Sequence, residues 1–325
     1  MNLIRTSWFP ILLGLIIFIV ILNQTFTCSK TAPITISSAN VYSETEEWQA
    51  PDTSEIPFTD EGYLIHYGQE LIANTAQYLG PQGIIARKSN GMNCQNCHLD
   101  AGTRLYSNSF AAVASTYPKY RDRSGRLESI EFRINECMER SLNGKALDSL
   151  SKEMRAMVAY VKWIGQGVPK DIKPQGAATE ELPYLDRAAD PQKGQTIFAM
   201  KCQRCHGANG DGVISGDSSF YVYPPLWGPK SYNVSAGMYR LSRLAGFIKN
   251  SMPLGATWKE PQLTNEEAWD LAAFINSQPR PLKFFPYDWP NIAKKPVDHP
   301  FGPYADSFSE QQHKFGPFGP IKKSK

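Results

Sequence analysis

The sequence reads Asn93-Cys94-Gln95-Asn96-Cys97-His98 in its first half and Lys201-Cys202-Gln203-Arg204-Cys205-His206 in its second half. Both stretches contain Cys-x-x-Cys-His, in which two thiols can add to the vinyl groups of a porphyrin and the adjoining imidazole can bind the iron. A zinc site or two disulfides would also use four cysteines, but neither requires a histidine after the second cysteine of both copies. The doubled motif therefore predicts two covalently bound haem c groups. Their expected attachment residues are Cys94, Cys97, Cys202 and Cys205, and their expected axial iron ligands include His98 and His206.

Length and composition agree with one haem domain for each motif. A chain of 325 residues usually forms about two domains, and an apolar share of 42% is ordinary for a globular protein. We expect a mainly α fold with two tandem c-type cytochrome domains, each holding one haem. The formal net charge of +3 is too small to indicate a nucleic-acid surface, so we expect no nucleic-acid partner.

Composition sets the expected domain boundaries. Residues 176–190 contain Gly, Pro and mixed charges and are interpreted as a linker. We expect one cytochrome c domain on either side of it, at residues 46–175 and 191–280. Residues 281–325 are rich in Pro, Phe and Gly, and because they are too aromatic for a disordered end we expect a tail packed on the body. Residues 1–45 are interpreted as a signal or anchor segment followed by a polar leader.

The N-terminal segment predicts export. One positive charge, Arg5, precedes an apolar run at residues 8–22, which is shorter than the ~20 residues of a membrane span. The segment therefore fits a secretory signal. Haem attachment outside the bacterial cytoplasmic membrane agrees with a periplasmic protein. Cys28 follows the run and leaves three outcomes open, which are removal with the signal, lipidation, and retention of the segment as an anchor. Membrane contact is expected only through this segment.

Apolar periodicity predicts matching helices in the two halves. Gly68 and Gly194 each begin a Gly-x-x-apolar-apolar pattern, which is similar to the way the first helix of a small c-type cytochrome meets its last helix at a glycine. We expect first helices at residues 62–72 and from Pro191 onward. After the motifs, apolar residues at i, i+3, i+4 and i+7 indicate amphipathic helices. These residues are Met154, Met157, Val158 and Val161 in the first half, and Ala268, Leu271, Ala272 and Ile275 in the second.

The second haem has one clear candidate for its sixth ligand. Met252 stands in the loop Asn250-Ser251-Met252-Pro253, after His206 and before the last helix, where a distal ligand is usual. Met238 precedes a helical pattern and is interpreted as a core residue. The turn Tyr223-Pro224-Pro225 can place a backbone carbonyl against the free N–H of His206 and fix its ring.

The first haem has two candidates for its sixth ligand, Cys137 and Met138. An axial Cys137 thiolate would stabilise ferric iron and give the first haem the lower reduction potential. Arg133 and Arg140 lie close by in sequence, and their positive charges would favour the thiolate. The alternative is a buried free cysteine with Met138 as the ligand. The residues alone leave both readings open.

Longer segments of the chain carry a family resemblance. The most specific are Arg133-Ile134-Asn135-Glu136-Cys137 with Arg140-Ser141, and Gln312-His313-Lys314-Phe315-Gly316-Pro317-Phe318 in the tail. With these segments the chain resembles the dihaem thiosulfate dehydrogenases, which are tetrathionate-forming cytochromes of the bacterial periplasm. The resemblance covers nearly all of the mature chain. It implies a catalytic His/Cys haem in residues 46–175 and a His/Met electron-transfer haem in residues 191–280.

The resemblance also implies which residues act. Cys137 would be the distal ligand of the first haem and would stand beside the substrate. Arg123, Arg133 and Ser141 would line that site. Because thiosulfate is a dianion, the two arginines would supply the positive charge that holds two such ions close together.

The implied reaction couples two thiosulfates to tetrathionate, and some members of the family run it in reverse. The Cys137 sulfur would act as the nucleophile toward a thiosulfate sulfur. Electrons would pass from the His/Cys haem to the His/Met haem and on to an external acceptor such as a small cytochrome c. The preferred direction depends on both reduction potentials and is not predicted.

A non-catalytic dihaem electron-transfer cytochrome of the periplasm is the alternative function. Its arginines would pair with haem propionates or helix carboxylates, and both of its haems would be His/Met. A dihaem peroxidase is a third class, but it needs an accessible iron face, against which Cys137 argues. The remaining histidines are expected to be packed or solvent-facing rather than iron ligands, and they are His66, His299 and His313.

Overall fold

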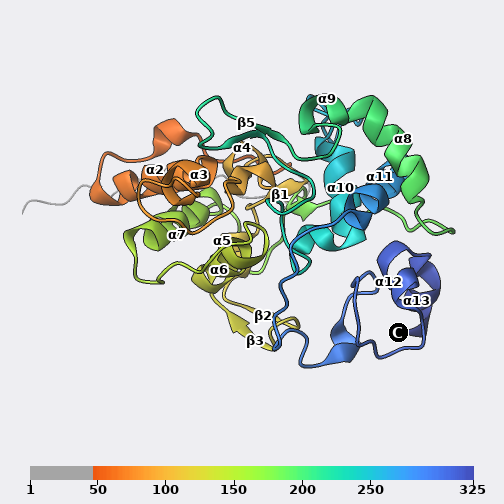
Figure 1. Ribbon diagram of the computed structural model, residues 1–325. Helices are drawn as coiled ribbons and strands as arrows, with labels where there is room; N and C mark the ends of the chain where they lie inside the picture. Colours follow the sequence, from red (N-terminus) through yellow and green to blue (C-terminus); the bar gives the residue numbers. More distant parts are fainter. Residues whose placement is uncertain (1–46) are drawn as a thin grey trace, which may run out of the picture. The chain divides into compact units, whose positions relative to one another are not determined.

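The computed structural model describes residues 47–325 (Figure 1). Residues 1–46, which carry the expected signal or anchor segment and Cys28, lie outside the described residues. All described residues belong to one compact unit, and most of their regular structure is helical, as expected. Within residues 47–325, no helix combines the length and the apolar character that a membrane span requires.

The first half places helices on both sides of the first motif. Helix α2 begins at Asp60, because Thr59 Oγ1 accepts a hydrogen bond from Gly62 N at 3.2 Å. Helix α7 begins in the same way, with Ser151 Oγ accepting from Met154 N at 3.2 Å. The helices of this half are η1 (Thr53–Glu55), α2 (Asp60–Ala73), α3 (Thr75–Leu79), η2 (Cys94–Asn96), α4 (Leu99–Gly102), α5 (Val113–Thr116), α6 (Ile130–Arg140) and α7 (Lys152–Ile164).

The second half repeats this plan. Pro191 is the first residue of α8, as expected, and Asp190 caps the helix by accepting from Gln192 N at 2.8 Å. Thr264 and Glu267 form a capping box at the start of α11. The helices of this half are α8 (Pro191–Lys201), α9 (Gln203–His206), η3 (Gly237–Tyr239), α10 (Leu241–Ser251) and α11 (Asn265–Ser277).

In each half, the first and the last long helix meet at a glycine. A Cβ atom added at Gly68 of α2 would lie 2.0 Å from the carbonyl oxygen of Ala156 on α7. A Cβ atom added at Gly194 of α8 would lie 2.0 Å from the carbonyl oxygen of Asp270 on α11. Any side chain would therefore separate the helix backbones. The expected glycine contact is confirmed in both halves.

Three small antiparallel sheets connect the helices of the described residues. Strand β1 (Ser107–Ser109) pairs with β4 (Ala178–Thr179), β2 (Lys119–Arg121) pairs with β3 (Arg126–Glu128), and β5 (Val213–Ile214) pairs with β6 (Tyr221–Tyr223). Strand β4 lies within the segment interpreted as a linker, so this segment is attached to the first half. Ser107 Oγ of β1 also lies 2.7 Å from Ser251 Oγ of α10, which joins the two halves.

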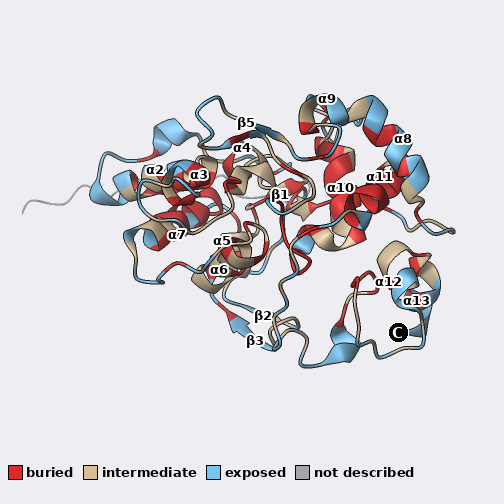
Figure 2. Cartoon of the chain, in the orientation of Figure 1, coloured by how far each residue is buried: buried red, intermediate tan, exposed pale blue. Residues whose placement is uncertain are grey.

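Two hydrophobic cores follow the two halves, and Figure 2 shows the buried residues concentrated on α7, α10 and α11. The first core contains Met154 and Tyr160 of α7. The second contains Trp269 of α11 together with the tail residues Phe318 and Ile321. Because the tail contributes to the second core, it is part of the folded body.

The C-terminal tail also has a buried polar centre. It contains η4 (Ile292–Lys294), α12 (Glu310–Phe315) and α13 (Phe318–Ser324). His299 Nε2 accepts a hydrogen bond from Trp289 Nε1 at 3.0 Å, and Asp298 Oδ1 accepts from Arg240 Nη2 at 2.6 Å. His299 and His313 are both buried, so both are packed residues, as expected.

Candidate functional site

The first motif holds His98 through a backbone carbonyl. His98 Nδ1 lies 2.6 Å from the carbonyl oxygen of Asn108 on β1, and the His98 and Phe110 ring centroids are 4.4 Å apart. Burial lowers the pKa of His98 to about 4, so the imidazole is neutral at neutral pH. The carbonyl contact makes Nδ1 the protonated nitrogen, which leaves the Nε2 lone pair for iron.

The second motif repeats the arrangement. His206 Nδ1 lies 2.9 Å from the carbonyl oxygen of Pro224, which is the contact expected of this turn. Burial also lowers the pKa of His206. His206 and Met252 line one cavity of about 430 Å³, and its lining includes Cys97 of the first motif. The two motifs therefore lie close together.

The residues present fit two haem c groups. Each half brings two thiols together with a neutral imidazole whose Nε2 is free. Arg280 provides a further sign, because its Nε and Nη1 are buried and have no hydrogen-bond partner among the described residues. Its guanidinium lies 4.2 Å from the ring centroid of Tyr232, which lines the cavity. Buried donors need an acceptor, and a haem propionate would be one.

Cys137, near the end of α6, is an electrostatic neighbour of both thiols of the first motif. Burial raises the pKa of Cys94 to about 11 and that of Cys97 to about 12, and negative charge on Cys137 contributes to both rises. Cys137 is half-buried. Its neighbour Met138 is only 1% exposed and belongs to the first core. Of the two candidate ligands, Cys137 is thus the one left accessible.

Arg133 lies one helical turn before Cys137. The Coulombic interaction with Cys137 is the main reason why the pKa of Arg133 lies above its ordinary value. Arg133 Nη1 donates to Glu136 Oε2 at 3.1 Å, and Glu136 Oε1 lies 3.2 Å from Arg140 Nη2. Arg133 therefore stands where it can stabilise negative sulfur and bind an anion.

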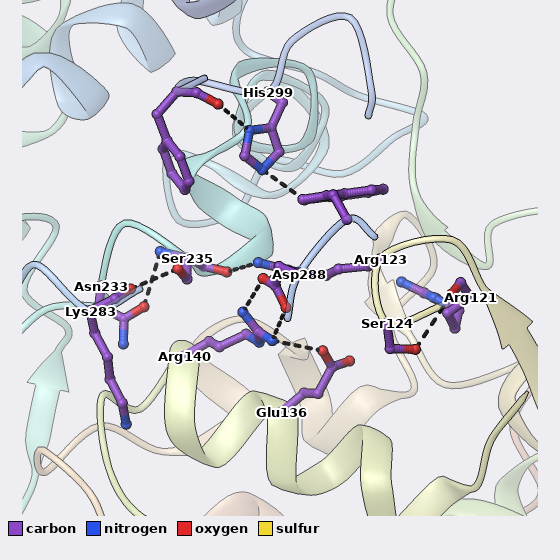
Figure 3. Close-up of polar contacts among 12 residues, drawn as sticks. Arg121, Arg123, Ser124, Glu136, Arg140, Asn233, Ser235, Lys283, Asp288 and His299 are labelled. Atoms are coloured by element: carbon purple, nitrogen blue, oxygen red, sulfur yellow. Dashed lines mark hydrogen bonds and ion pairs between the residues drawn. The ribbon is translucent and has the colours of Figure 1, made fainter. Parts of the chain in front are cut away.

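Arg123 approaches α6 from the turn between β2 and β3 (Figure 3). Its Nε donates to Asp288 Oδ2 at 2.9 Å, and its Nη2 donates to the carbonyl oxygen of Ser235 at 2.6 Å. The same Asp288 accepts two hydrogen bonds from Arg140 of α6, at 2.7 and 2.8 Å. Arg123 and α6 are thus connected through a carboxylate of the tail.

The structure brings the expected substrate residues to one region around α6. Ser141 follows α6 directly, is half-buried, and donates its backbone N–H to the carbonyl oxygen of Cys137 at 2.9 Å. Sequence reasoning did not identify Glu136 and Asp288. The spacing of Glu136 from Arg133 and Arg140 is a local signal for ion pairs. Asp288 has no such signal, because it lies far away in the sequence.

Comparison with protein families gives two matches. The family model described as "SoxA/TsdA, cytochrome c domain" matches residues 85–169. The family model described as "Cytochrome c" matches residues 191–279. With the helical structure, these matches confirm the expected fold of two tandem c-type cytochrome domains.

Curated relatives match over most of the chain. A thiosulfate dehydrogenase of Psychrobacter arcticus is 40% identical over 244 residues, which cover 74% of this chain and 71% of that protein. A thiosulfate dehydrogenase of Allochromatium vinosum is 43% identical over 197 residues, which cover 59% of this chain and 71% of that protein.

A solved structure is also similar. It is the as-isolated thiosulfate dehydrogenase TsdBA of Marichromatium purpuratum, with a TM-score of 0.68 and 29% sequence identity. The match covers 84% of this chain and 54% of that longer chain. The likeness therefore extends over most of this chain and concerns about half of the solved chain.

Proposed function

Because this chain belongs to the thiosulfate dehydrogenase family, we propose that it couples two thiosulfate ions to one tetrathionate beside Cys137. The observation that carries the proposal is a half-buried cysteine with Arg133 as its electrostatic neighbour, close to the thiols of a haem-attachment motif. An electron-transfer cytochrome without a catalytic step would not need this arrangement.

Positive charge is the first requirement of the reaction, because two dianions must approach each other. Arg133 and Arg123 would bind the sulfonate groups, since a guanidinium offers several N–H donors in one plane. Burial, and then the neighbouring Arg140, lower the pKa of Arg123 to about 10, so Arg123 keeps its charge at neutral pH. Ser141 would add a neutral hydrogen-bond donor next to Cys137.

The sulfur chemistry balances in two steps. First, the Cys137 thiolate and the outer sulfur of one thiosulfate form an S–S bond, with release of two electrons. Second, the outer sulfur of another thiosulfate attacks the thiosulfate-derived sulfur of this adduct. Tetrathionate leaves and the Cys137 thiolate returns. Two thiosulfate dianions thus give one tetrathionate dianion and two electrons, and the same steps in reverse would reduce tetrathionate.

His98 and Cys137 would hold the first haem c group, and His206 and Met252 would hold the second. When bound, these covalently attached groups would supply the one-electron acceptors for the reaction, with an external acceptor such as a small cytochrome c beyond them. The protein's contribution is to hold the imidazoles. The carbonyl oxygens of Asn108 and Pro224 keep the Nδ1–H of each histidine engaged and its Nε2 free. We place the protein in the periplasm, which agrees with haem attachment outside the bacterial cytoplasmic membrane.

An anaerobic visible spectrum tests the proposal. The purified ferric protein is recorded before and after thiosulfate is added, and tetrathionate is assayed in the same cuvette. We expect haem reduction together with tetrathionate, because the two electrons have no other acceptor. No spectral change and no tetrathionate, together with no reoxidation of the reduced protein by tetrathionate, would favour the electron-transfer cytochrome instead.

A further inference from the structure

Asp288, in the C-terminal tail, joins two arginines of the first half (Figure 3). Its Oδ2 accepts from Arg123 Nε at 2.9 Å and from Arg140 Nη1 at 2.7 Å, and its Oδ1 accepts from Arg140 Nη2 at 2.8 Å. The side chains of Arg123, Asp288 and Arg140 are 15%, 17% and 7% exposed. In such largely buried surroundings, charge-assisted hydrogen bonds fix the orientation of a side chain.

Arg123 is held by residues that are distant in the sequence. Besides Asp288, its Nη2 donates to the carbonyl oxygen of Ser235 in the second half at 2.6 Å. Its own carbonyl oxygen accepts from Trp289 N of the tail at 2.6 Å. Its Nη1 makes no hydrogen bond within the described part of the chain. One edge of the guanidinium is therefore engaged, and one amino group is left for a ligand.

Arg140 connects this arrangement to the helix that carries Cys137. It lies one turn after Cys137 on α6, and its guanidinium stacks on the ring of Phe285 of the tail at 3.8 Å. Both of its amino groups are engaged by carboxylates, through Asp288 and Glu136. Asp288 therefore links the turn that bears Arg123 to the end of α6.

We propose that Asp288 is a positioning residue for the anion site, holding the Arg123 guanidinium so that its Nη1 can bind a sulfonate group of thiosulfate or tetrathionate. This inference rests on the proposed function. Asp288 itself is not expected to touch the substrate, because its carboxylate would repel a dianion and both of its oxygens are engaged by arginines.

If Asp288 acted only through its charge, its removal would change KM in one direction, and if it positions Arg123, its removal would change KM in the other. Three arginines (Arg123, Arg133 and Arg140) share two carboxylates (Asp288 and Glu136) in this cluster. Removing the charge of Asp288 makes the cluster more positive, which by itself would tighten the binding of a dianion. Removing its hydrogen bonds releases Arg123, which weakens binding. The sign of the change in KM therefore separates the two roles.

The test compares Asp288→Asn with Asp288→Glu in steady-state thiosulfate oxidation by the haem-loaded full chain. We expect Asp288→Asn to raise KM about tenfold and to change kcat less than about threefold, because one charge-assisted contact to the anion is misplaced. Asp288→Glu keeps the carboxylate, so its KM should lie within about threefold of that of the unmodified protein. An unchanged or lower KM in Asp288→Asn would overturn the proposal.

Asp298→Asn is the matched control. Asp298 is a buried carboxylate of the same tail and also binds an arginine, Arg240, but in the second half of the chain. Its loss should lower the melting temperature without raising KM. If Asp298→Asn raised KM as much as Asp288→Asn does, general loosening of the tail would explain both results, and the positioning role would be wrong.

A binding measurement separates failure of this inference from failure of the proposed function. Ferric protein cannot reduce tetrathionate, so the rise in melting temperature with added tetrathionate reports binding without turnover. Asp288→Asn should need about ten times more tetrathionate for the same rise. If the unmodified protein fails to oxidise thiosulfate but this difference is found, the proposed reaction fails and the positioning role stands. If oxidation occurs and the difference is absent, only the positioning role fails.

Discussion

The two haem-binding halves share their framework and differ on the side where the sixth ligand is expected. In both halves a glycine brings the first helix against a backbone carbonyl of the last helix, at Gly68 and Gly194, with the same distance of 2.0 Å for an added Cβ atom. In both halves the motif histidine donates Nδ1–H to a backbone carbonyl. On the distal side, the first half has a charged helix, α6, whereas the second half has Met252 in a cavity lined largely by apolar residues.

This difference between the halves indicates which part of the repeated fold can vary to support a reaction. The shared framework presents two thiols and one histidine in the same way in both halves. In the first half, the side where the sixth ligand is expected has Cys137 together with Arg133 and Arg140, and Asp288 of the tail binds Arg140 and Arg123. We therefore expect changes to the framework to affect both halves alike, and changes on the distal side to affect them differently.

The largest difference between the halves is expected at Cys137. Cys137→Gly removes the sulfur that forms the S–S bond with thiosulfate, so turnover should fall by about a thousandfold or more. The haem content and the reduction potential of the second haem, which His206 would bind, should not change. Turnover is measured as tetrathionate formed per haem, with haem content from the visible spectrum.

Met138→Leu is the control for Cys137→Gly, because it replaces the neighbouring sulfur on the same helix. Met138 is buried in the first core, and a swap that conserves volume usually costs less than about 1.5 kcal/mol of stability. Turnover should be retained. Full turnover in Cys137→Gly, or its loss in Met138→Leu, would favour Met138 as the ligand and exclude the proposed sulfur chemistry.

The glycine crossings should respond equally, which tests the shared framework. Gly68→Ala and Gly194→Ala each force a methyl group against a backbone carbonyl oxygen, so each should lower the free energy of unfolding by about 3 kcal/mol. Gly167→Ala is the control, because an added Cβ atom there meets nothing within 4 Å. Thermal and denaturant unfolding of the holoprotein measure the changes. A large loss for one crossing variant and none for the other would contradict the equivalence of the two halves.

Local signals explain why the framework could be predicted from the sequence. The Cys-x-x-Cys-His spacing, the helix start at Pro191, and the pattern after Gly68 all lie within a few residues of the structure they produce. The contacts of Arg123 could not be predicted in this way. Its partners Ser235 and Asp288 belong to other segments, and no periodicity relates a turn in the first half to a carboxylate of the tail.

The expected substrate residues also show that contacts between distant segments cannot be predicted from local sequence. Arg123, Arg133 and Ser141 were inferred from a resemblance, not from spacing, and their roles remain predictions. Arg140 was expected to favour the Cys137 thiolate because the two are close in sequence. In the structure, the amino groups of Arg140 are engaged by Asp288 and Glu136. Proximity in sequence indicated the right helix but could not reveal carboxylates that come from elsewhere in the fold.

Low pH should destabilise the C-terminal tail, which contains His299 and contacts the first half through Asp288. Burial, and also the charges of Lys295, Arg123 and Arg240, lower the pKa of His299 to about 3 from its ordinary value of 6.5. The unfolded chain therefore binds this proton at a higher pH than the folded chain does. The stability that His299 contributes is complete above pH 6.5 and is lost as the pH falls toward 3.

The slope of stability against pH measures this effect. One histidine changes the free energy of unfolding by at most ~1.4 kcal/mol per pH unit. His299→Gln removes the titrating group, so between pH 6 and 4 the free energy of unfolding of this variant should depend on pH less steeply than that of the original protein, by up to about 1.4 kcal/mol per pH unit. Equal slopes for the two proteins would show that His299 is already protonated in the folded state.

The smallest effect is expected at Arg280, and it should appear in the second half alone. Arg280 is 9% exposed, and its Nη2 donates to the carbonyl oxygen of Ile275, which lines the cavity beside Met252. Its other donors, Nε and Nη1, would pair with a propionate of the second haem. Arg280→Met keeps the length of the side chain and removes the charge. Because positive charge near iron disfavours the ferric state, the potential of the second haem should fall by about 30–60 mV.

Arg243→Met makes the same change in net charge at a place where the arginine is paired near the surface with Glu181. If proximity to the haem matters, this control should shift the potential far less than Arg280→Met does, because solvent screens the lost charge. The potential of the first haem should stay constant in both variants, since the cation that acts on His98 is Arg133. Each half would then tune its iron with its own arginine. Equal shifts of the reduction potentials of both haems in Arg280→Met would instead mean that the two sites share one electrostatic environment. The two halves would then differ only in their expected iron ligands.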